Sequence, residues 1–403
     1  MESEGNEKQM FKSTMKKIFI KFFGEFQIGS EFLNKCSNTS GWILLKIIDA
    51  IFRGIGQVCF ANNPISGAFC LVGLYLGSPV VALAAVVASI SAIISSLIFD
   101  QPFCNVTNGL NQFNAVLIGT VLSSLYPTLY SGSQTDIELW ILIIFGSILS
   151  IPIQNGIGNL LHSLTTKSST FTSDGSFTER KLGMVSFTFP FNVVGQISFV
   201  LLALRAKSLS INEPMNDVYT NETNPHSSVD WLKVAEGSLL SIGQVYAINT
   251  LIGSLVMIIG FFICSPILAA SMSLGGALGT CTALILLRND QKSLEAIYTG
   301  IYGYNSVLTA GALGGFFVVL TWHSFIRCIC GIILTVTLHI AIGAAYAGNS
   351  LVQIPVCTLP FVVACWMFHL NTSQTSTALS RVASPSVPEI HLEQYLRACK
   401  SFK

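Results

Sequence analysis

Charged residues are scarce in this chain. Asp, Glu, Lys and Arg make up 10% of its 403 residues, while 51% are hydrophobic; a soluble globular domain carries about 25% charged residues. The ranges 54–99, 237–287 and 328–380 contain none of these four residue types. One helical crossing of a bilayer needs roughly 20 apolar residues, so each range can hold at least two crossings. Because the runs lack the alternation of barrel strands, they predict an all-α integral membrane protein embedded in a lipid bilayer.

Other features are missing as well, and each absence excludes a class of function. A net charge of +1 gives no electrostatic footprint for a nucleic-acid partner. The 11 cysteines show no CxxC or Cys/His ligand spacing, so we predict no metal site and no cofactor. The sequence also contains no nucleophile–base constellation and no phosphate-binding loop. We therefore predict no catalytic residues and no enzymatic activity.

The apolar segments fall into two sets separated by a hydrophilic stretch. They lie at 41–61, 64–77, 79–99, 114–129, 137–160 and 187–206, and at 231–248, 251–264, 266–287, 304–320, 324–347 and 355–370. We predict a cytoplasmic N-terminal tail (1–40), a first transmembrane repeat (41–206), an extracellular loop (207–230), a second transmembrane repeat (231–370) and a cytoplasmic C-terminal tail (371–403).

The two sets are related in sequence. The string GQV at 56–58 recurs at 243–245, the range 109–114 aligns with 300–305, and TFPF at 188–191 matches TLPF at 358–361. Because the matches occur in the same order in both sets, we interpret the chain as a duplicated unit.

The distribution of lysine and arginine predicts the orientation. Both tails are basic, which favours a cytoplasmic position for both. An odd number of crossings in each set then gives two halves of inverted topology and an extracellular loop between them. The sequon at Asn221 in that loop is a candidate glycosylation site and is consistent with this location. We expect a multi-pass protein of the plasma membrane.

Each set has six apolar segments, so one of them must fail to cross the bilayer fully. The short, glycine-interrupted segments 64–77 and 251–264 and the polar range 105–113 are the candidates. Short or broken elements at equivalent positions of two repeats are the best sequence indication of a binding site near the midplane. We predict about five transmembrane helices and one re-entrant half-helix per repeat, with a pore between the repeats.

Few ionisable residues fall in the apolar segments. Ion-coupled carriers usually hold such residues inside the membrane, whereas here Lys46 and Asp49 begin one set, and Lys233 and Glu236 begin the other. A spacing of three allows each pair to meet on one helical face. An interfacial ion pair is the first interpretation, and ion coupling through Asp49 or Glu236 is the alternative.

The polar residues that recur are neutral. Burying an amide or hydroxyl without a partner costs roughly 1–3 kcal/mol, so repetition in both halves indicates a use. We interpret the Gln57/Gln244 and Thr188/Thr358 pairs as pore lining. For Asn114 and Asn305, bridging of broken helices and pore lining both remain open.

Together these elements resemble the urea transporter family. The string NPISG at 63–67, the two GQV strings, the Gly-x-x-x-Phe/Tyr-Asn elements at 109–114 and 300–305, and the two Thr-x-Pro-Phe elements follow the family's order. The likeness covers nearly all of 41–370. It implies passive, channel-like transport of urea, a small neutral solute, by a homotrimer with one pore per protomer between inverted halves.

The resemblance also implies roles for individual residues. The mouths of the filter would be lined by Gln57 and Phe60 on one side and Gln244 on the other; a flat slot would be walled by Phe113, Leu117, Tyr304 and Leu308; Thr188 and Thr358 would supply paired hydroxyls at its centre; and Asn63, Asn114 and Asn305 would support the re-entrant elements. Apolar walls exclude hydrated ions, while oxygens along the slot edge accept N–H groups at several weak sites.

The sequence departs from the family pattern in four places. Thr250 and Leu251 stand where the second half should repeat Asn-Pro, and Asn111 and Gln112 replace an aromatic residue and a glycine before Phe113. Tyr304 adds a hydroxyl to one slot wall, and Ala247 replaces a bulkier residue opposite Phe60. These departures leave the solute open between urea, a urea analogue, a larger amide and water, and they motivate one alternative, a transport-inactive membrane receptor or scaffold. The other alternative, an ion-coupled transporter of a small amide, rests on Asp49 or Glu236.

Overall fold

The computed structural model describes residues 24–36, 41–130, 132–164, 166–172, 177–210, 229–347, 354–370 and 379–401. This part of the chain is mostly helical, as predicted. The helices long and apolar enough to cross a bilayer are α5 (Pro79–Ile98), α7 (Phe113–Tyr130), α8 (Ile137–Ser163), α9 (Phe189–Ser210), α12 (Pro266–Leu287) and α15 (Trp322–Ala347). The chain is therefore a multi-pass membrane protein by length and composition of its helices.

Shorter elements complete both halves. The first half adds α2 (Gln27–Lys35), α3 (Gly41–Gln57), α4 (Pro64–Gly77), α6 (Phe103–Thr107) and the strands β1 (Thr166–Phe171) and β2 (Phe177–Leu182). The second adds α10 (Trp231–Gln244), α11 (Leu251–Cys264), α13 (Gln291–Tyr298), α14 (Tyr304–Gly311), the π-helix η1 (Ala312–Phe316), α16 (Leu359–Leu370), β3 (Arg381–Val382) and α17 (Pro388–Ser401). The helices that fall in the predicted apolar segments agree with them to within a few residues at most of their ends, whereas α2, α6, α13, α17 and the three strands were not predicted.

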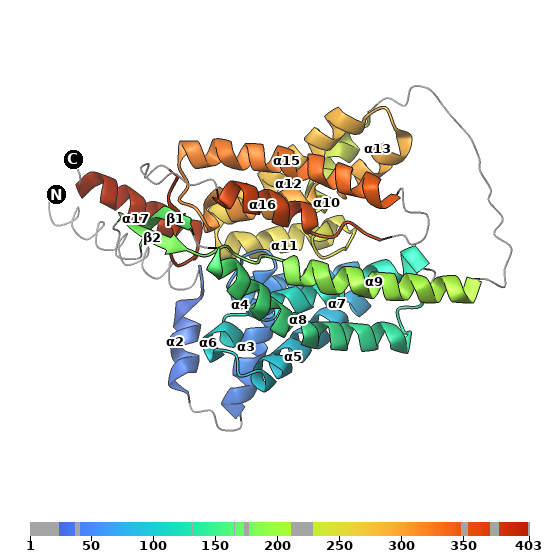
Figure 1. The fold of residues 1–403 in the computed structure, drawn as a ribbon, viewed down its shortest axis with the longest axis horizontal. Coiled ribbons are helices and arrows are strands. Elements are labelled where there is room, and N and C mark those ends of the chain that lie inside the picture. The colour runs from blue at the N-terminus through green and yellow to red at the C-terminus, as the bar shows by residue number, and fades with distance from the viewer. Residues whose placement is uncertain are drawn as a thin grey trace, which may run out of the picture.

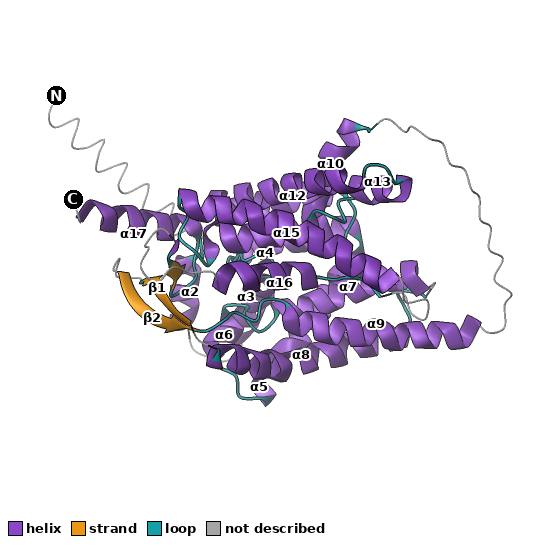
Figure 2. Ribbon diagram, turned by 45° about the horizontal axis from the view of Figure 1, so that its top comes forward, coloured by secondary structure: helices purple, strands orange, loops and turns teal. Residues whose placement is uncertain are grey.

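In Figure 1 the helices of the second half lie above those of the first, and the two halves meet most closely at α4 and α11. In both views α2, the β1–β2 hairpin and α17 gather at one end of the molecule, on the left, while α9 ends at the opposite end, on the right (Figures 1 and 2). The range 105–113, one candidate for a re-entrant element, contains the end of α6 and the turns that lead into α7.

Helices α4 and α11 join the halves through small residues. At 14 residues each, they span only about 21 Å at 1.5 Å per residue, less than the bilayer core. A Cβ atom on Gly73 of α4 would lie 2.7 Å from the carbonyl oxygen of Gly253 of α11. The Ser66 hydroxyl donates to the Gly260 carbonyl oxygen at 2.6 Å. Without side chains in the way, the two backbones approach closely, which is how helices associate in a membrane.

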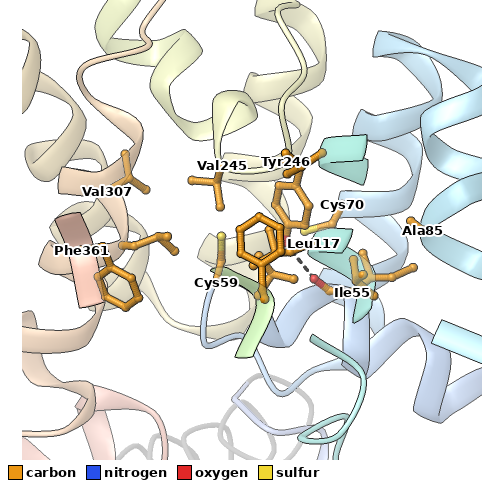
Figure 3. Close-up of a cluster of buried hydrophobic side chains, with 14 of the residues drawn as sticks. Ile55, Cys59, Cys70, Ala85, Leu117, Val245, Tyr246, Val307 and Phe361 are labelled. Atoms are coloured by element: carbon orange, nitrogen blue, oxygen red, sulfur yellow. Dashed lines mark hydrogen bonds between the residues drawn. The ribbon is translucent and has the colours of Figure 1, made fainter. Parts of the chain in front are cut away.

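A buried apolar cluster continues this contact between the halves. Tyr246, which follows α10, reaches into the first half, where its hydroxyl donates to the Ile55 carbonyl oxygen at 2.8 Å (Figure 3). Its ring lies beside Cys59 and Cys70 and is fully buried (Figure 3). The cysteines therefore serve as small apolar residues in this core.

A small sheet, which the sequence analysis did not predict, ties the C-terminal segment to the polar stretch between α8 and α9. Its order is β2-β1-β3, with β1 antiparallel to β2 and parallel to β3. Beyond β3, the Glu389 carboxylate of α17 accepts hydrogen bonds from the Ser265 hydroxyl and, at 2.8 Å, from the Ile267 amide. A carboxylate at a helix N-terminus is favourable, so α17 caps α12.

Arg53, on α3, organises the region of the first half around the end of that helix. It is 1% exposed, and its Nε donates to Asp49 at 2.7 Å. The guanidinium also donates to Asn62, to the Glu25 carbonyl oxygen and to the Ser30 hydroxyl at 2.8–3.0 Å. One buried cation thus joins α3, the turn before α4 and the segment that contains α2.

The predicted pairing of Lys46 with Asp49 is wrong. Asp49 pairs with Arg53 instead, because a spacing of four places the guanidinium beside the carboxylate, and Lys46 Nζ donates to the Cys36 carbonyl oxygen at 2.9 Å. In the second half, Lys233 Nζ lies 5.7 Å above the ring of Tyr298.

Replacing Arg53 by Met should destabilise the protein strongly. The change leaves the Asp49 carboxylate and several buried acceptors without their donor, and breaking such a buried pair costs about 3–5 kcal/mol. The control is Arg205→Met, which removes an ion pair with Glu138 whose side chains are 50% and 35% exposed and which should cost about 0–1 kcal/mol. Melting temperatures in detergent measure both, and equal shifts would contradict the role of Arg53.

Candidate functional site

Two threonine hydroxyls meet at the centre of the interface between the halves. Thr188 directly precedes α9 and Thr358 directly precedes α16. Each follows a residue in the left-handed region, Phe187 (φ 47°) and Cys357 (φ 52°). Their Oγ1 atoms lie 2.6 Å apart, and both side chains are buried. The structure therefore brings together the two hydroxyls that the sequence predicts at the constriction.

A cavity lies on each side of this hydroxyl pair. The Phe60 cavity, of about 410 Å³, is lined by Thr188, Gln57, Phe60 and Phe113 and extends to Glu25 and Pro385. The Ala247 cavity, of about 590 Å³, is lined by Thr358, Gln244, Ala247 and Tyr304 and extends to Tyr346 and Ala347. The predicted residues Gln57, Phe60 and Phe113 thus face one cavity, and Gln244 and Tyr304 face the other.

Gln57 and Gln244 occupy equivalent positions. Gln57 Nε2 donates to the Asn108 carbonyl oxygen at 3.0 Å, and Gln244 Nε2 donates to the Thr299 carbonyl oxygen at 2.9 Å. The next residues, Gly109 and Gly300, have φ of 72° and 79°. A Cβ on Gly109 would lie 2.4 Å from the Gly54 amide nitrogen, so only glycine fits there. Each glutamine therefore satisfies a carbonyl that a sharp turn leaves outside the helices.

Phe60 and Ala247 share a backbone conformation but not a side chain. Both are left-handed, with φ of 62° and 59°. The Phe60 ring packs against Phe316 and Phe317, with centroids at 5.1 and 5.8 Å. Phe187 and Phe361 extend this aromatic cluster, and all five rings line the Phe60 cavity. Ala247 brings no ring, consistent with the larger volume of its cavity.

The predicted slot walls are only partly at the cavities. Leu117 and Leu308 lie one helical turn beyond Phe113 and Tyr304, are fully buried, and are not among the residues that line either cavity. The added hydroxyl of Tyr304 donates to the Cys357 carbonyl oxygen at 2.5 Å. It therefore stabilises the left-handed turn before Thr358.

The three predicted supporting asparagines bond to broken helix ends. Asn63 Oδ1 caps α4 by accepting from the amides of Ile65 and Ser66. Asn114 Oδ1 accepts from the Phe191 amide at 3.2 Å. Asn305 Nδ2 donates to the Cys357 carbonyl oxygen at 3.1 Å. Of the two interpretations left open for Asn114 and Asn305, these contacts favour bridging, since neither residue lines a cavity.

The residues that depart from the family pattern also have local partners. Asn111 Nδ2 donates to the Ser96 hydroxyl at 3.1 Å, and Gln112 Nε2 donates to the Val106 carbonyl oxygen at 2.8 Å. Thr250 precedes α11 without a side-chain cap, unlike Asn63 before α4. The substitutions near Phe113 are therefore accommodated within the first half. The sequon at Asn221 lies outside the described residues.

Sequence reasoning missed two residues close to the hydroxyl pair. Asn192, 2% exposed, donates through Nδ2 to Thr358 Oγ1 at 2.9 Å. His339 lines the Ala247 cavity and packs against the rings of Tyr302 and Tyr304 at 5.2 and 5.4 Å. Asn192 aligns with Val362, so the repeat gave no signal for it. His339 Nδ1 lies 3.3 Å from Asn305 Nδ2, where in the first half Gln154 accepts from Asn114 Nδ2 at 2.8 Å, so these two positions match but their residue types differ.

The C-terminal segment holds the aromatic side of the Phe60 cavity. His391 Nδ1 lies 3.0 Å from the Gly315 carbonyl oxygen, and its Nε2 accepts from the Ser386 amide at 3.1 Å. Gly315 has φ of 128° and breaks the helical path just before Phe316 and Phe317. Because Nε2 must be bare to accept, His391 is neutral here, and burial lowers its pKa.

Comparison with known proteins fits this arrangement. The family model described as urea transporter matches residues 48–373, which is well over half of the chain. The chain belongs to the urea transporter family.

Members of the urea transporter family also match along most of their length. Urea transporter 1 of Capra hircus is 28% identical over 369 residues, covering 88% of this chain and 85% of the relative. The protein of that name from Ovis aries gives the same identity and coverage. Urea transporter 1 of Mus musculus is 26% identical over 339 residues, covering 82% and 79%. The family is one of transporters, and the resemblance to it that the sequence motifs indicate is confirmed.

The neutral state of His391 predicts a pH dependence of stability. Its folded pKa lies below the ordinary value of 6.5, so its contribution to stability is complete above pH 6.5 and is lost as the pH falls towards the folded pKa. One proton changes the free energy of unfolding by at most about 1.4 kcal/mol per pH unit. Melting temperatures in detergent from pH 7.5 to 5.5 should fall less in His391→Gln, which keeps a donor and an acceptor, than in wild type. The exposed control His162→Gln should behave as wild type, and an unchanged slope in His391→Gln would refute the assignment.

Proposed function

We propose that this protein lets urea diffuse passively through a narrow neutral passage between its two halves. The observation that carries the proposal is the hydroxyl pair of Thr188 and Thr358, which has one cavity on each side. Among the described residues, no Asp, Glu, Lys or Arg lines the Ala247 cavity, and Glu25 is the one such residue that lines the Phe60 cavity. Without charge at the constriction, hydrated ions gain nothing that replaces their water.

The chemistry of the constriction suits a flat, uncharged donor of hydrogen bonds. The Thr188–Thr358 hydrogen bond closes the path between the cavities. A urea molecule that enters exchanges this bond for bonds between its own groups and the two hydroxyls. Because a neutral hydrogen bond contributes only about 0.5–1.5 kcal/mol net, the exchange is nearly balanced. The solute then neither meets a high barrier nor becomes trapped.

The proposed path has the two halves in inverted orientation, with five membrane helices and a shorter element in each. Support comes from the shared backbone turns at Phe60 and Ala247 and at Gly109 and Gly300. The positions of α2 and α17 at one end and of the end of α9 at the other also support it (Figure 1). The basic tails favour cytoplasmic termini in a plasma membrane. The family resemblance favours a homotrimer. We also propose the tail, repeat and loop boundaries given in the sequence analysis.

Ion coupling is less well supported. Asp49, one candidate for a coupling group, is already paired with buried Arg53. Glu236 is exposed near the start of α10. Neither side chain is among those that line the two cavities. The alternative of a transport-inactive scaffold is motivated by the altered motifs alone. Three of the altered residues, Asn111, Gln112 and Tyr304, donate hydrogen bonds within the protein.

Purified protein in vesicles should therefore raise urea permeability without regard to ion gradients. Stopped-flow light scattering gives the rate with and without imposed proton and sodium gradients, against protein-free vesicles as control. The expected result is a flux that follows the urea gradient alone. A dependence on either ion gradient would favour the coupled carrier, and no flux from folded protein would favour the scaffold.

Replacing either hydroxyl of the central pair should slow urea. Thr188→Val and Thr358→Val keep the side-chain shape and remove one hydrogen-bonding group, so we expect each to reduce urea permeability by about two- to tenfold, the effect of one neutral hydrogen bond. The control is Thr128→Val on α7, where an exposed hydroxyl bonds the Leu125 carbonyl oxygen of its own helix. Unchanged permeability in both central variants would remove these threonines from the path.

A further inference from the structure

Asn192 links the two hydroxyl-bearing residues of the constriction. It lies on α9, four residues after Thr188, and is 2% exposed. Its Nδ2 donates to the Thr188 carbonyl oxygen at 2.8 Å and to Thr358 Oγ1 at 2.9 Å. One amide group therefore spans both halves at the point where their hydroxyls meet.

The orientation of this amide follows from its partners. The Thr188 carbonyl can only accept a hydrogen bond, so the nitrogen of the amide and not its oxygen must face it. Both N–H groups of Asn192 are then in use. Its Oδ1 is buried and has no hydrogen-bond partner among the described residues. A buried acceptor left without a partner is costly, which indicates a use at this position.

The second half has no counterpart to this amide. Val362 is the equivalent residue of α16. Its backbone N–H donates to the Thr358 carbonyl oxygen at 3.1 Å, just as the backbone N–H of Asn192 donates to the Thr188 carbonyl oxygen at 3.0 Å. The first helical turns thus match, while the side chains differ. Asn192 is therefore not needed to form this turn, because valine occupies the same backbone position in the other half.

The amide makes the two hydroxyls unequal. Thr358 Oγ1 accepts from Asn192, and accepting a hydrogen bond strengthens a hydroxyl as a donor. Either hydroxyl can be the donor in the Thr188–Thr358 bond, so one O–H of the pair is left to donate in turn. That remaining O–H and the two hydroxyl oxygens complement a molecule that carries a carbonyl oxygen and an N–H side by side.

We propose that Asn192, which lines neither cavity, is a positioning residue that holds the two hydroxyls in place for the passing solute. The ligand class is that of small primary amides and ureas. This inference rests on the proposed function, because it concerns the same passage.

Asn192→Val tests the inference in vesicles that report urea and water permeability side by side. The variant copies the residue of the second half and should lower urea permeability about two- to tenfold, with water permeability unchanged or raised. In a Thr358→Val background it should add little, because residues that act through one another are not additive. The exchange Asn192→Val with Val362→Asn moves the amide next to Thr188 and should recover urea permeability.

The outcomes separate the inference from the function beneath it. A parallel fall in urea and water permeability would mark Asn192 as a packing residue and overturn the inference. So would an Asn192→Val variant that conducts urea as fast as a conducting wild type. A wild type without urea flux would overturn the proposed function itself, and this inference with it. Should the valine variant fail to fold, the smaller Asn192→Ser carries the same expectations.

Discussion

The structure depends on how broken helices satisfy their backbone groups inside a bilayer. A membrane offers no water to an unpaired carbonyl or amide, yet the chain turns sharply at Phe60, Ala247, Phe187 and Cys357 near its centre. Side-chain amides take up the groups that these breaks release, as when Gln57 donates to Asn108 and Gln244 to Thr299. With those amides engaged, the central threonine hydroxyls are the polar groups that the proposed passage offers to a solute.

Much of this arrangement could be predicted from the sequence, because duplication repeats the same physical problem. A glutamine that must pair a turn carbonyl, or a threonine that must meet its counterpart, appears at matching positions in both halves. Gln57 and Gln244 do face the two cavities, and Thr188 and Thr358 do meet. The segment boundaries could be predicted for a simpler reason: polar or proline-containing turns such as Ser78-Pro79 and Ser265-Pro266 end each apolar run.

Residues that do not recur in both halves could not be predicted from the sequence. Asn192 corresponds to Val362, and His339 corresponds to a residue of another type, Gln154, so neither stood out as a repeated residue. Arg53 was overlooked because a single charge beside an apolar run looks interfacial, while its partners at Glu25, Ser30 and Asn62 come together only in the fold. The wrong pairing of Lys46 with Asp49 has a local cause, because Arg53 lies four residues after Asp49 on the same helix.

The two cavities differ in volume and in their lining residues, and this difference can affect the rate of transport but not its direction. Phe60 and its aromatic neighbours narrow one approach, while Ala247 and its surroundings leave the other wider. A passage that couples to no energy source reaches equal urea concentrations from either side, whatever its shape, so this asymmetry cannot give transport a direction. It can change how fast molecules of different size reach the hydroxyl pair from each side. In the proposed passage, selection by shape therefore belongs to the approaches, and selection by hydrogen bonding belongs to Thr188 and Thr358, which Asn192 positions.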